Sequence, residues 1–267
     1  MATTRHPQIE EDLGWIASQP LPWTEFRDKC LLITGATGFI GGYLLELFSF
    51  LNEKDADNNT RITALVRDKK RFYQRFPHLR ERNDIDLLVG DLTEISPLKL
   101  ETSPDFIIHC ASEASPRHYL QQPADTITTN TLGSLLLLEM ARKHQARFLY
   151  LSSGAIYGQN QQEVLTEQDY GIVDPLDERA CYSEGKRAGE AICMAYHRQH
   201  GLDIRIARVS HTYGPGLELN DGRVFTDFMA DALAGRNINI KGCPSDARPF
   251  CYISDMVEGL LRILLKG

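Results

Sequence analysis

Short apolar runs alternate with segments of helical spacing along most of this chain, and this alternation restricts the possible folds most strongly. Each run has the length of a buried strand, and polar or glycine-rich turns separate it from the helical segment that follows. Strands of this kind, joined through helices, form a parallel sheet that is covered on both faces. The predicted strands are 30–34, 62–66, 86–89, 106–110, 148–151 and 204–207.

The fold class that this pattern predicts is α/β, with a doubly wound, Rossmann-like parallel sheet. We expect residues 1–29 to be a polar N-terminal arm with Trp15 and Trp23 as apolar anchors. Residues 30–209 form the predicted dinucleotide-binding domain, and residues 210–267 form a smaller C-terminal lobe. The predicted helices are 39–51, 126–142, 180–199, 224–233 and one from Ser254, with a further strand at 238–240.

Composition excludes several classes of protein. The chain carries 29 Lys and Arg against 36 Asp and Glu, and this acidic balance disfavours a nucleic-acid or anionic-membrane partner. Six scattered cysteines show no C-x-x-C pair and no metal-ligand spacing, so we expect a reducing compartment and no metal. The polar first eleven residues have no signal-peptide core, and no apolar segment is long enough to span a bilayer. We therefore expect a soluble, cytoplasmic protein.

A glycine-rich turn follows the first predicted strand and leads into a helix. Its three glycines have distinct roles: a tight turn, close approach of the backbone to a pyrophosphate, and close packing of helix and strand. The N–H groups at the start of the helix then face the phosphates. The turn and helix start predicted to bind a dinucleotide are Gly35, Thr37, Gly38, Phe39, Ile40 and Gly41.

The next two strand ends are predicted to meet the adenosine part of that dinucleotide. After the second strand, Arg67 would pair with a 2′-phosphate, whereas Asp68 would accept hydrogen bonds from a 2′-OH. Arg67 comes first, so the pattern tilts slightly toward NADP over NAD, with a solvated charged turn as the alternative. After the third strand, Asp91 and Leu92 are placed to contact the adenine.

A tyrosine and a lysine four residues apart are the candidates for the chemistry. Tyr182 and Lys186 lie one above the other on a predicted helix face, and a nearby cation lowers the pKa of a phenol toward neutrality. Ser152 and Ser153 follow the fifth strand at the carboxyl edge, where doubly wound sheets bind ligands. Tyr182, Lys186 and the serine at the strand end together predict a phenol base with a serine hydroxyl as its partner.

Six stretches of the chain match motifs of a known family. They are GATGFIG at 35–41, GDL at 90–92, HCAS at 109–112, TNTLG at 129–133, SSGAIYG at 152–158 and YSEGK at 182–186. With these motifs the chain resembles the extended short-chain dehydrogenase/reductases, in their nucleotide-sugar epimerase/dehydratase branch, over about residues 30–265. The stretches 220–224 and 248–255 are similar to UDP-glucuronate decarboxylases and dTDP-glucose 4,6-dehydratases, and UDP-glucose 4-epimerase belongs to the same branch.

The resemblance implies a tightly held NAD(P)+ that takes a hydride from a sugar carbon and usually returns it. By motif position, Tyr182 would be the general base and Ser153 its hydroxyl partner. Lys186 would orient the nicotinamide ribose and lower the tyrosine pKa. The further residues that the resemblance places against the cofactor are Ala111, Ser112 and Asn130.

The resemblance also implies a UDP- or dTDP-sugar as substrate. Arg223 and Arg248 would bind its diphosphate, a role that suits a guanidinium, although an ordinary surface position fits Arg223 equally well. His211 stands where the branch usually has an Asn that holds this diphosphate; a packed, non-contacting histidine is the alternative. The branch usually forms a homodimer through the helices corresponding to 126–142 and 180–199. Since the branch has a longer C-terminal lobe, we expect 210–267 to be a partial, truncated substrate-binding lobe.

One departure from the branch bears on the reaction. Its dehydratases and decarboxylases carry an acidic residue two positions after the catalytic Ser or Thr, whereas here Gly154 and Ala155 follow Ser153. This favours an epimerase that acts through a 4-keto sugar. The alternatives are a 4,6-dehydratase or decarboxylase that takes its acid from Glu163 or Glu167, a net reductase, and a non-catalytic cofactor-binding protein.

Overall fold

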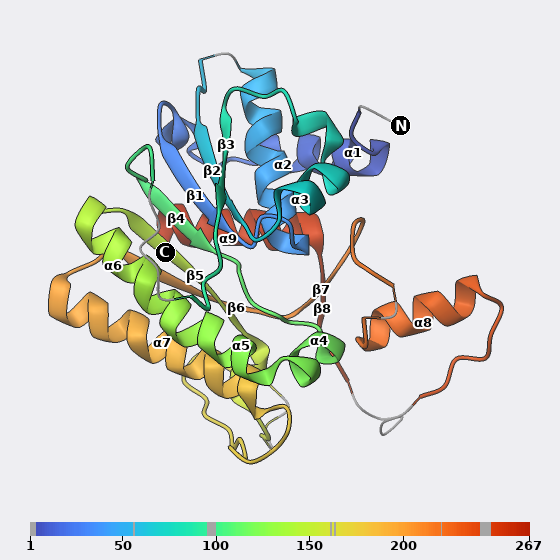
Figure 1. Ribbon diagram of the computed structural model, residues 1–267. Helices are drawn as coiled ribbons and strands as arrows, with labels where there is room; N and C mark the ends of the chain where they lie inside the picture. Colours follow the sequence, from blue (N-terminus) through green and yellow to red (C-terminus); the bar gives the residue numbers. More distant parts are fainter. Residues whose placement is uncertain are drawn as a thin grey trace.

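A six-stranded, wholly parallel sheet forms the centre of the molecule (Figure 1). The computed structural model describes residues 4–55, 57–94, 100–160, 162, 164–219, 221–240 and 247–267. In the strand order β3-β2-β1-β4-β5-β6, the chain adds β2 and β3 on one side of β1 and the later strands on the other. The switch point between β1 and β4 is where doubly wound sheets bind ligands. The strands are β1 (Cys30–Thr34), β2 (Arg61–Val66), β3 (Ile85–Val89), β4 (Phe106–His109), β5 (Arg147–Ser153) and β6 (Ile204–Val209). All six predicted strands are confirmed.

Two layers of helices cover the sheet, each over its own apolar core. One layer holds α1 (Pro7–Ala17), α2 (Phe39–Lys54), α3 (Lys69–Arg75) and α9 (Ile253–Lys266), with the short helices Trp23–Phe26 and Pro77–Leu79. The other layer holds α4 (Pro116–Gln121), α5 (Pro123–Thr128), α6 (Ser134–His144) and α7 (Ala180–His200). The helix predicted at 126–142 is therefore several pieces, because a π-helical turn at Thr129–Gly133 joins α5 to α6.

The expectation of a polar arm before the first strand is wrong. Residues 7–17 form helix α1, in which Leu13 and Ile16 are fully buried against α2 and α9. Leu13 and Ile16 are three positions apart and so share one helix face. Trp15 points away from that face and is 43% exposed, whereas Trp23 does pack against the core.

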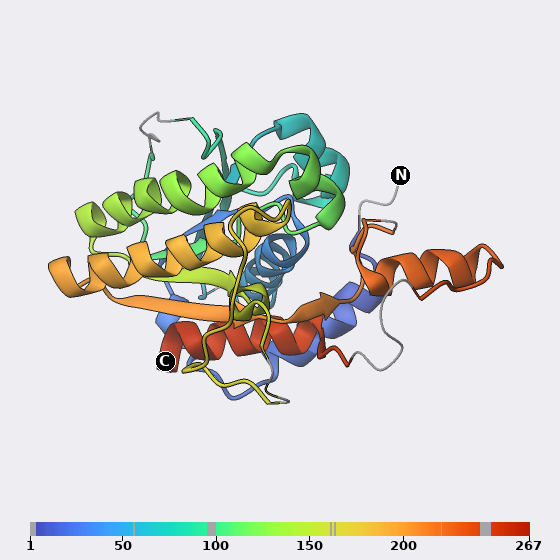
Figure 2. The ribbon, with the colours of Figure 1, turned by 90° about the horizontal axis from the view of Figure 1, so that it is seen from below.

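The C-terminal part of the chain adds a small parallel pair of strands and a projecting helix. Strand β7 (His211–Tyr213) pairs with β8 (Phe250–Tyr252), and neither strand was predicted. Helix α8 (Val224–Leu233) agrees with its prediction and extends away from the sheet in both views (Figures 1 and 2). The strand expected at 238–240 is wrong: the segment belongs to no strand, and its isoleucines lie 49% and 62% exposed.

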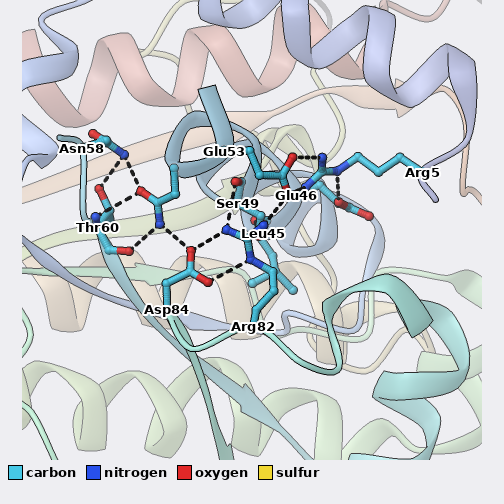
Figure 3. Close-up of polar contacts among 10 residues, drawn as sticks. Arg5, Leu45, Glu46, Ser49, Glu53, Asn58, Thr60, Arg82 and Asp84 are labelled. Atoms are coloured by element: carbon cyan, nitrogen blue, oxygen red, sulfur yellow. Dashed lines mark hydrogen bonds and ion pairs between the residues drawn. The ribbon is translucent and has the colours of Figure 1, made fainter. Parts of the chain in front are cut away.

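The amino-terminal edge of the sheet is closed by polar side chains that bind one another (Figure 3). Arg82 donates to both carboxylate oxygens of Asp84, at 2.8 and 2.6 Å, just before β3, and also pairs with Glu53 of α2. Arg5 binds Glu53 and, at 2.6 Å, Glu46 on the same helix. These contacts join the start of the chain, α2 and the approach to β3 into one network.

Candidate active site

The glycine turn between β1 and α2 has the geometry that a phosphate needs. Gly35 has a φ of 65°, and a Cβ there would lie 2.8 Å from the main-chain N of Ala111. A Cβ on Gly41 would lie 2.4 Å from the carbonyl oxygen of Gly35, so helix and turn could not pack as they do. No side chain caps the first turn of α2, which leaves its N–H groups to an anion.

The other predicted residues of this turn contribute mainly backbone. Phe39 and Ile40 turn their side chains to the core, so at the helix start they offer main-chain N–H groups. Gly38 is exposed, and its own N–H donates to the carbonyl of Gly35 at 2.8 Å. Thr37 is half-buried beside it.

Several buried polar atoms at the carboxyl edge have no hydrogen-bond partner within the described ranges. They include Ser112 Oγ, Asn130 Oδ1, Ser152 Oγ and His109 Nε2. Buried polar atoms in folded proteins nearly always have partners, so an orphaned group of this kind indicates a polar ligand or water. The residues present therefore fit a dinucleotide laid across the ends of β1, β4 and β5.

The π-helical turn brings Asn130 into this region. Its amide donates to the carbonyl of Thr126 at 2.9 Å, while its Oδ1 faces inward without a partner among the described residues. Helix α7 approaches closely because it carries glycines: a Cβ on Gly185 would lie 3.2 Å from Asn130 Cβ. A Cβ on Gly189 would lie 2.1 Å from the hydroxyl of Tyr150. The chain thus packs α7, with Tyr182 and Lys186, tightly onto β5 and Asn130.

The predicted catalytic residues come together at the end of β5. Ser153 is the last residue of that strand, and its Oγ accepts a hydrogen bond from the N–H of Ala155 at 3.1 Å. Burial raises the pKa of Tyr182 above its usual value, whereas a hydrogen bond from Ser153 and the charge of Arg223 lower it. Ser153 thus lies close enough to Tyr182 to influence its phenol, and its role as the hydroxyl partner stays a prediction.

The role expected for Lys186 in lowering the pKa of Tyr182 stays a prediction. Lys186 lies only 3% exposed, and its Nζ donates to the carbonyl of Leu151 at 2.6 Å, 5.9 Å from the centre of the Tyr182 ring. The charge of Arg223 also lowers the pKa of Tyr182. Burial lowers the pKa of Lys186 itself to about 7, so this amine can gain and lose a proton near neutrality.

Tyr119 is a site residue that sequence reasoning missed. Its ring, on α4, stacks on the ring of Tyr182 with centroids 5.5 Å apart and planes 12° apart. Stacking of this kind fixes the plane of the phenol. The available signal was an aromatic residue in the helix that follows β4, at the carboxyl edge of the sheet.

The three residues predicted to bind a diphosphate influence one another electrostatically. Burial lowers the pKa of His211, and the charges of Arg248 and Arg223 lower it further, so it is mostly neutral at pH 7. Arg223 pairs with Asp221 at 3.3 Å, and the carbonyl of Asp221 accepts from Ser115 Oγ at 2.5 Å. These contacts hold Arg223 near Tyr182 and give this side of the site a positive charge.

At the adenosine end, the predicted residues are engaged in different ways. Asp68 caps α3 by accepting from the N–H groups of residues 70 and 71, whereas Arg67 pairs with Glu113 at 2.8 Å. Asp91 accepts from the N–H and hydroxyl of Thr93, both at 2.9 Å. Leu92 is buried against the π-helical turn: a Cβ on Gly133 would lie 3.0 Å from that of Leu92.

Comparison with known proteins identifies the class. The model of the NAD dependent epimerase/dehydratase family matches residues 31–267, and the chain belongs to this family. Among its relatives is UDP-glucuronic acid decarboxylase 6 of Arabidopsis thaliana, 40% identical over 88% of this chain and 65% of that protein. UDP-glucuronic acid decarboxylase 1 of Xenopus tropicalis is 36% identical over 92% of this chain and 56% of its own. The chain thus spans between about half and two thirds of these relatives.

Solved structures agree in fold. An epimerase from Methanothermobacter thermautotrophicus has a TM-score of 0.75 at 25% identity, covering 97% of this chain and 72% of that one. The UDP-glucuronic acid 4-epimerase of Bacillus cereus, solved with UDP-glucuronic acid and NAD, has a TM-score of 0.74 at 20% identity, covering 89% and 75%. The predictions of family and α/β fold are confirmed. Within the described ranges, no helix combines the length and apolarity needed to cross a membrane.

Proposed function

We propose that this chain oxidises a nucleotide sugar at C4 and reduces the resulting ketone again, and that its product is the C4 epimer. The observation that carries the proposal is the turn after Ser153. It fixes the serine hydroxyl through the N–H of Ala155, and it places the methyl group of Ala155 where a dehydratase of the branch has a carboxylate. The site has a phenol and a hydroxyl for proton transfer at the C4 oxygen. It has no carboxylate at residue 155 to assist the loss of water.

Each side chain has a distinct task in this scheme. Tyr182 would accept the proton of the C4 hydroxyl while the C–H bond at C4 breaks. Ser153 would donate a hydrogen bond to the oxygen on C4. A dinucleotide held there would supply the hydride chemistry of the oxidation and the re-reduction. Lys186 and Asn130 would hold the nicotinamide ribose, since Lys186 Nζ and Asn130 Oδ1 are both buried beside the carboxyl edge of the sheet. Re-reduction of the ketone from its opposite face would invert the configuration at C4.

The alternative acids receive no support from the structure. Glu163 lies outside the described residues. Glu167 is exposed, and its main-chain carbonyl, rather than its carboxylate, is held by Arg208 at 2.9 Å. A 4,6-dehydratase would need such a carboxylate at the sugar, so we prefer epimerisation to elimination of water as the proposed reaction.

The proposed substrate class is a UDP-sugar. Arg223, Arg248 and His211 together provide the positive charge and the donors that a diphosphate requires. The relatives and several solved structures are named for UDP-sugars, which favours uridine over other bases.

Decarboxylation is the second candidate, because the relatives that align with most of this chain are UDP-glucuronic acid decarboxylases. Oxidation of a hexuronic acid at C4 gives a β-keto acid. Its C5–C6 bond then breaks, its electron pair forms an enolate, carbon dioxide leaves, and C5 takes up a proton. A donor to the C4 oxygen, such as Ser153 or Tyr182, assists this step without any acid at residue 155.

For the cofactor we propose NAD in preference to NADP. Arg67 was the residue that tilted the sequence toward NADP, and its guanidinium is paired with the carboxylate of Glu113. A carboxylate beside Arg67 repels a 2′-phosphate and offers an acceptor to a 2′-OH. Solved structures of the same fold are named as complexes with NAD.

The test is product analysis with the purified chain, NAD+ and, separately, UDP-glucose, UDP-galactose and UDP-glucuronic acid. A product of unchanged mass with a new retention time supports the epimerase, and loss of carbon dioxide supports the decarboxylase. Loss of water, or stoichiometric consumption of NADH, contradicts both. Binding of NAD+ without turnover of any sugar supports a non-catalytic cofactor-binding protein.

The homodimer implied by the family resemblance stays a prediction. Leu132, Leu135 and Met194 lie partly exposed on the layer of α6 and α7, where such a contact would form. Light scattering coupled to size-exclusion chromatography measures the mass, and a monomer at micromolar concentration would contradict the dimer.

A further inference from the structure

Helix α1 lies outside the stretch that the family model matches, which begins at residue 31. It nevertheless packs against both α2 and α9, one helix from each end of the chain. Figures 1 and 2 show α1 beside α2, with α9 running under the sheet. An added helix that contacts both regions can fix their relative position.

One buried carboxylate makes this connection directly. Asp12, 6% exposed, accepts a hydrogen bond from the hydroxyl of Tyr43 on α2 at 2.9 Å. It accepts another from the hydroxyl of Tyr252 on β8, at 3.0 and 3.2 Å to its two oxygens. Gln8 adds a longer contact of 3.4 Å, and no ion pair to Asp12 occurs within the described part of the chain. A buried carboxylate needs donors, and two phenols provide them.

Both phenols are donors at neutral pH. Burial, the hydrogen bond to Asp12 and its charge raise the pKa of Tyr43. The same causes raise the pKa of Tyr252 to about 12. A hydrogen bond from a neutral donor to an ionised acceptor is stronger than one between neutral groups.

Tyr252 connects Asp12 to the residues proposed to hold the diphosphate. It is the last residue of β8, and its ring meets Tyr213 of β7 edge-on, with centroids 5.4 Å apart. Strands β7 and β8 pair in the register His211 to Phe250, and Arg248 is two residues before Phe250. The position of Tyr252 therefore sets the position of both His211 and Arg248.

We propose that Asp12 is a positioning residue for nucleotide-sugar binding, which holds β8 at a fixed place relative to α2 and the cofactor turn. This rests on the proposed function, since it takes His211 and Arg248 as the residues that meet the diphosphate. Asp12 touches neither sugar nor cofactor. It acts through Tyr252 on one side and Tyr43 on the other.

The test compares three variants of the full chain by calorimetry with UDP and with NAD+ as probes. Tyr252→Phe and Asp12→Leu break the connection, and Tyr252→Phe keeps the ring that packs on Tyr213. Tyr196→Phe is the matched control, because it removes one phenol–carboxylate hydrogen bond, to Glu139, between α6 and α7. Hydrogen exchange at the amides of 211–213 and 250–252 is measured on the same proteins.

We expect UDP to bind about tenfold more weakly to Tyr252→Phe and to Asp12→Leu, the effect of losing one hydrogen bond to a charged group. We expect NAD+ affinity to stay within about twofold and exchange in β7 and β8 to accelerate, while Tyr196→Phe matches wild type in all three. A merely stabilising role would lower the melting temperature and leave the UDP-to-NAD+ ratio of affinities unchanged.

Two results separate this proposal from the proposed function. If wild type binds UDP and the Asp12 and Tyr252 variants change neither UDP affinity nor exchange in β7 and β8, the positioning role of Asp12 is wrong. If wild type binds no UDP, but these variants accelerate exchange in β7 and β8 alone, Asp12 still positions the strands, and the assignment of His211 and Arg248 to a diphosphate fails.

Discussion

The two edges of the central sheet differ in how fully their buried polar atoms are hydrogen-bonded. At the amino edge, Arg82 binds both Asp84 and Glu53, and among the described residues Arg205 Nε is the buried polar atom at this edge that lacks a partner. At the carboxyl edge, Ser112 and Asn130 keep buried polar atoms for which the described residues provide no partner. Polar groups that are satisfied internally serve stability, and buried groups that are not satisfied indicate a ligand. Most of the buried atoms without a partner lie at the carboxyl edge, which makes this edge the candidate site for a ligand.

The largest expected effect lies at the carboxyl edge. Tyr182→Phe removes the proton acceptor and keeps the ring that stacks on Tyr119, so turnover should fall about 10²- to 10⁴-fold, the usual contribution of a general base. The melting temperature should stay at the wild-type value. Tyr170→Phe, at a tyrosine that is 87% exposed, is the control and should keep full activity. A lower melting temperature of Tyr182→Phe, together with the loss of turnover, would contradict a purely functional role of this residue.

An intermediate effect is expected at the amino edge, and on stability alone. Arg82→Leu leaves Asp84 partly buried without its principal donor, which should lower the free energy of unfolding by about 1–3 kcal/mol. Substrate and cofactor affinities should not change. Arg27→Leu breaks a pair with Asp55 in which both side chains are nearly half exposed, and should cost at most about 1 kcal/mol. Urea titrations of the two variants measure the difference.

The same variant has an expected pH signature. Burial alone would raise the pKa of Asp84, but hydrogen bonds from Arg82 and Asn52 lower it overall. A carboxylate with a depressed pKa stabilises the fold above its unfolded pKa of about 3.9, and this stability is lost as the pH falls through the folded pKa. The drop in unfolding free energy between about pH 6 and pH 3 should therefore be smaller in Arg82→Leu than in wild type. A drop of equal size would contradict this account of Asp84.

The smallest expected effect concerns cofactor choice. Glu113→Gln frees Arg67 from an exposed ion pair, so NADP+ should bind up to about fivefold more tightly while NAD+ affinity changes little. Calorimetric titration with each dinucleotide measures both constants. A gain for NAD+ instead of NADP+ would place Glu113 on a ribose hydroxyl rather than against Arg67.

The sheet was predictable from the sequence because its inner strands are buried on both faces. Segments such as 30–34 and 106–109 are almost wholly apolar, so they can be recognised as buried strands. The glycine turn after the first strand predicts that a ligand binds at the carboxyl ends of the strands. Ser153, Tyr182 and Lys186 could be predicted for the same reason, since strand end and helix spacing place them at one edge.

What the sequence did not reveal depends on contacts between distant parts of the chain. Arg223 contributes a positive charge near Tyr182. Its ion-pair partner Asp221 is held by a hydrogen bond from Ser115. The pairing of β7 with β8 joins segments almost forty residues apart, and each has only three residues. No local pattern predicts contacts of this kind, because short strands show too few alternations to be read.

The main-chain N–H of Ala155 holds the oxygen of Ser153 whatever side chain residue 155 carries. Replacement of the methyl group by a carboxylate therefore leaves the serine hydroxyl in place. Alanine and glutamate codons that end in the same purine differ by a single base. A gene of this family can thus gain or lose an acid at the position of Ala155 in one mutational step. Descendants of one ancestor can then differ in reaction while sharing the rest of the site.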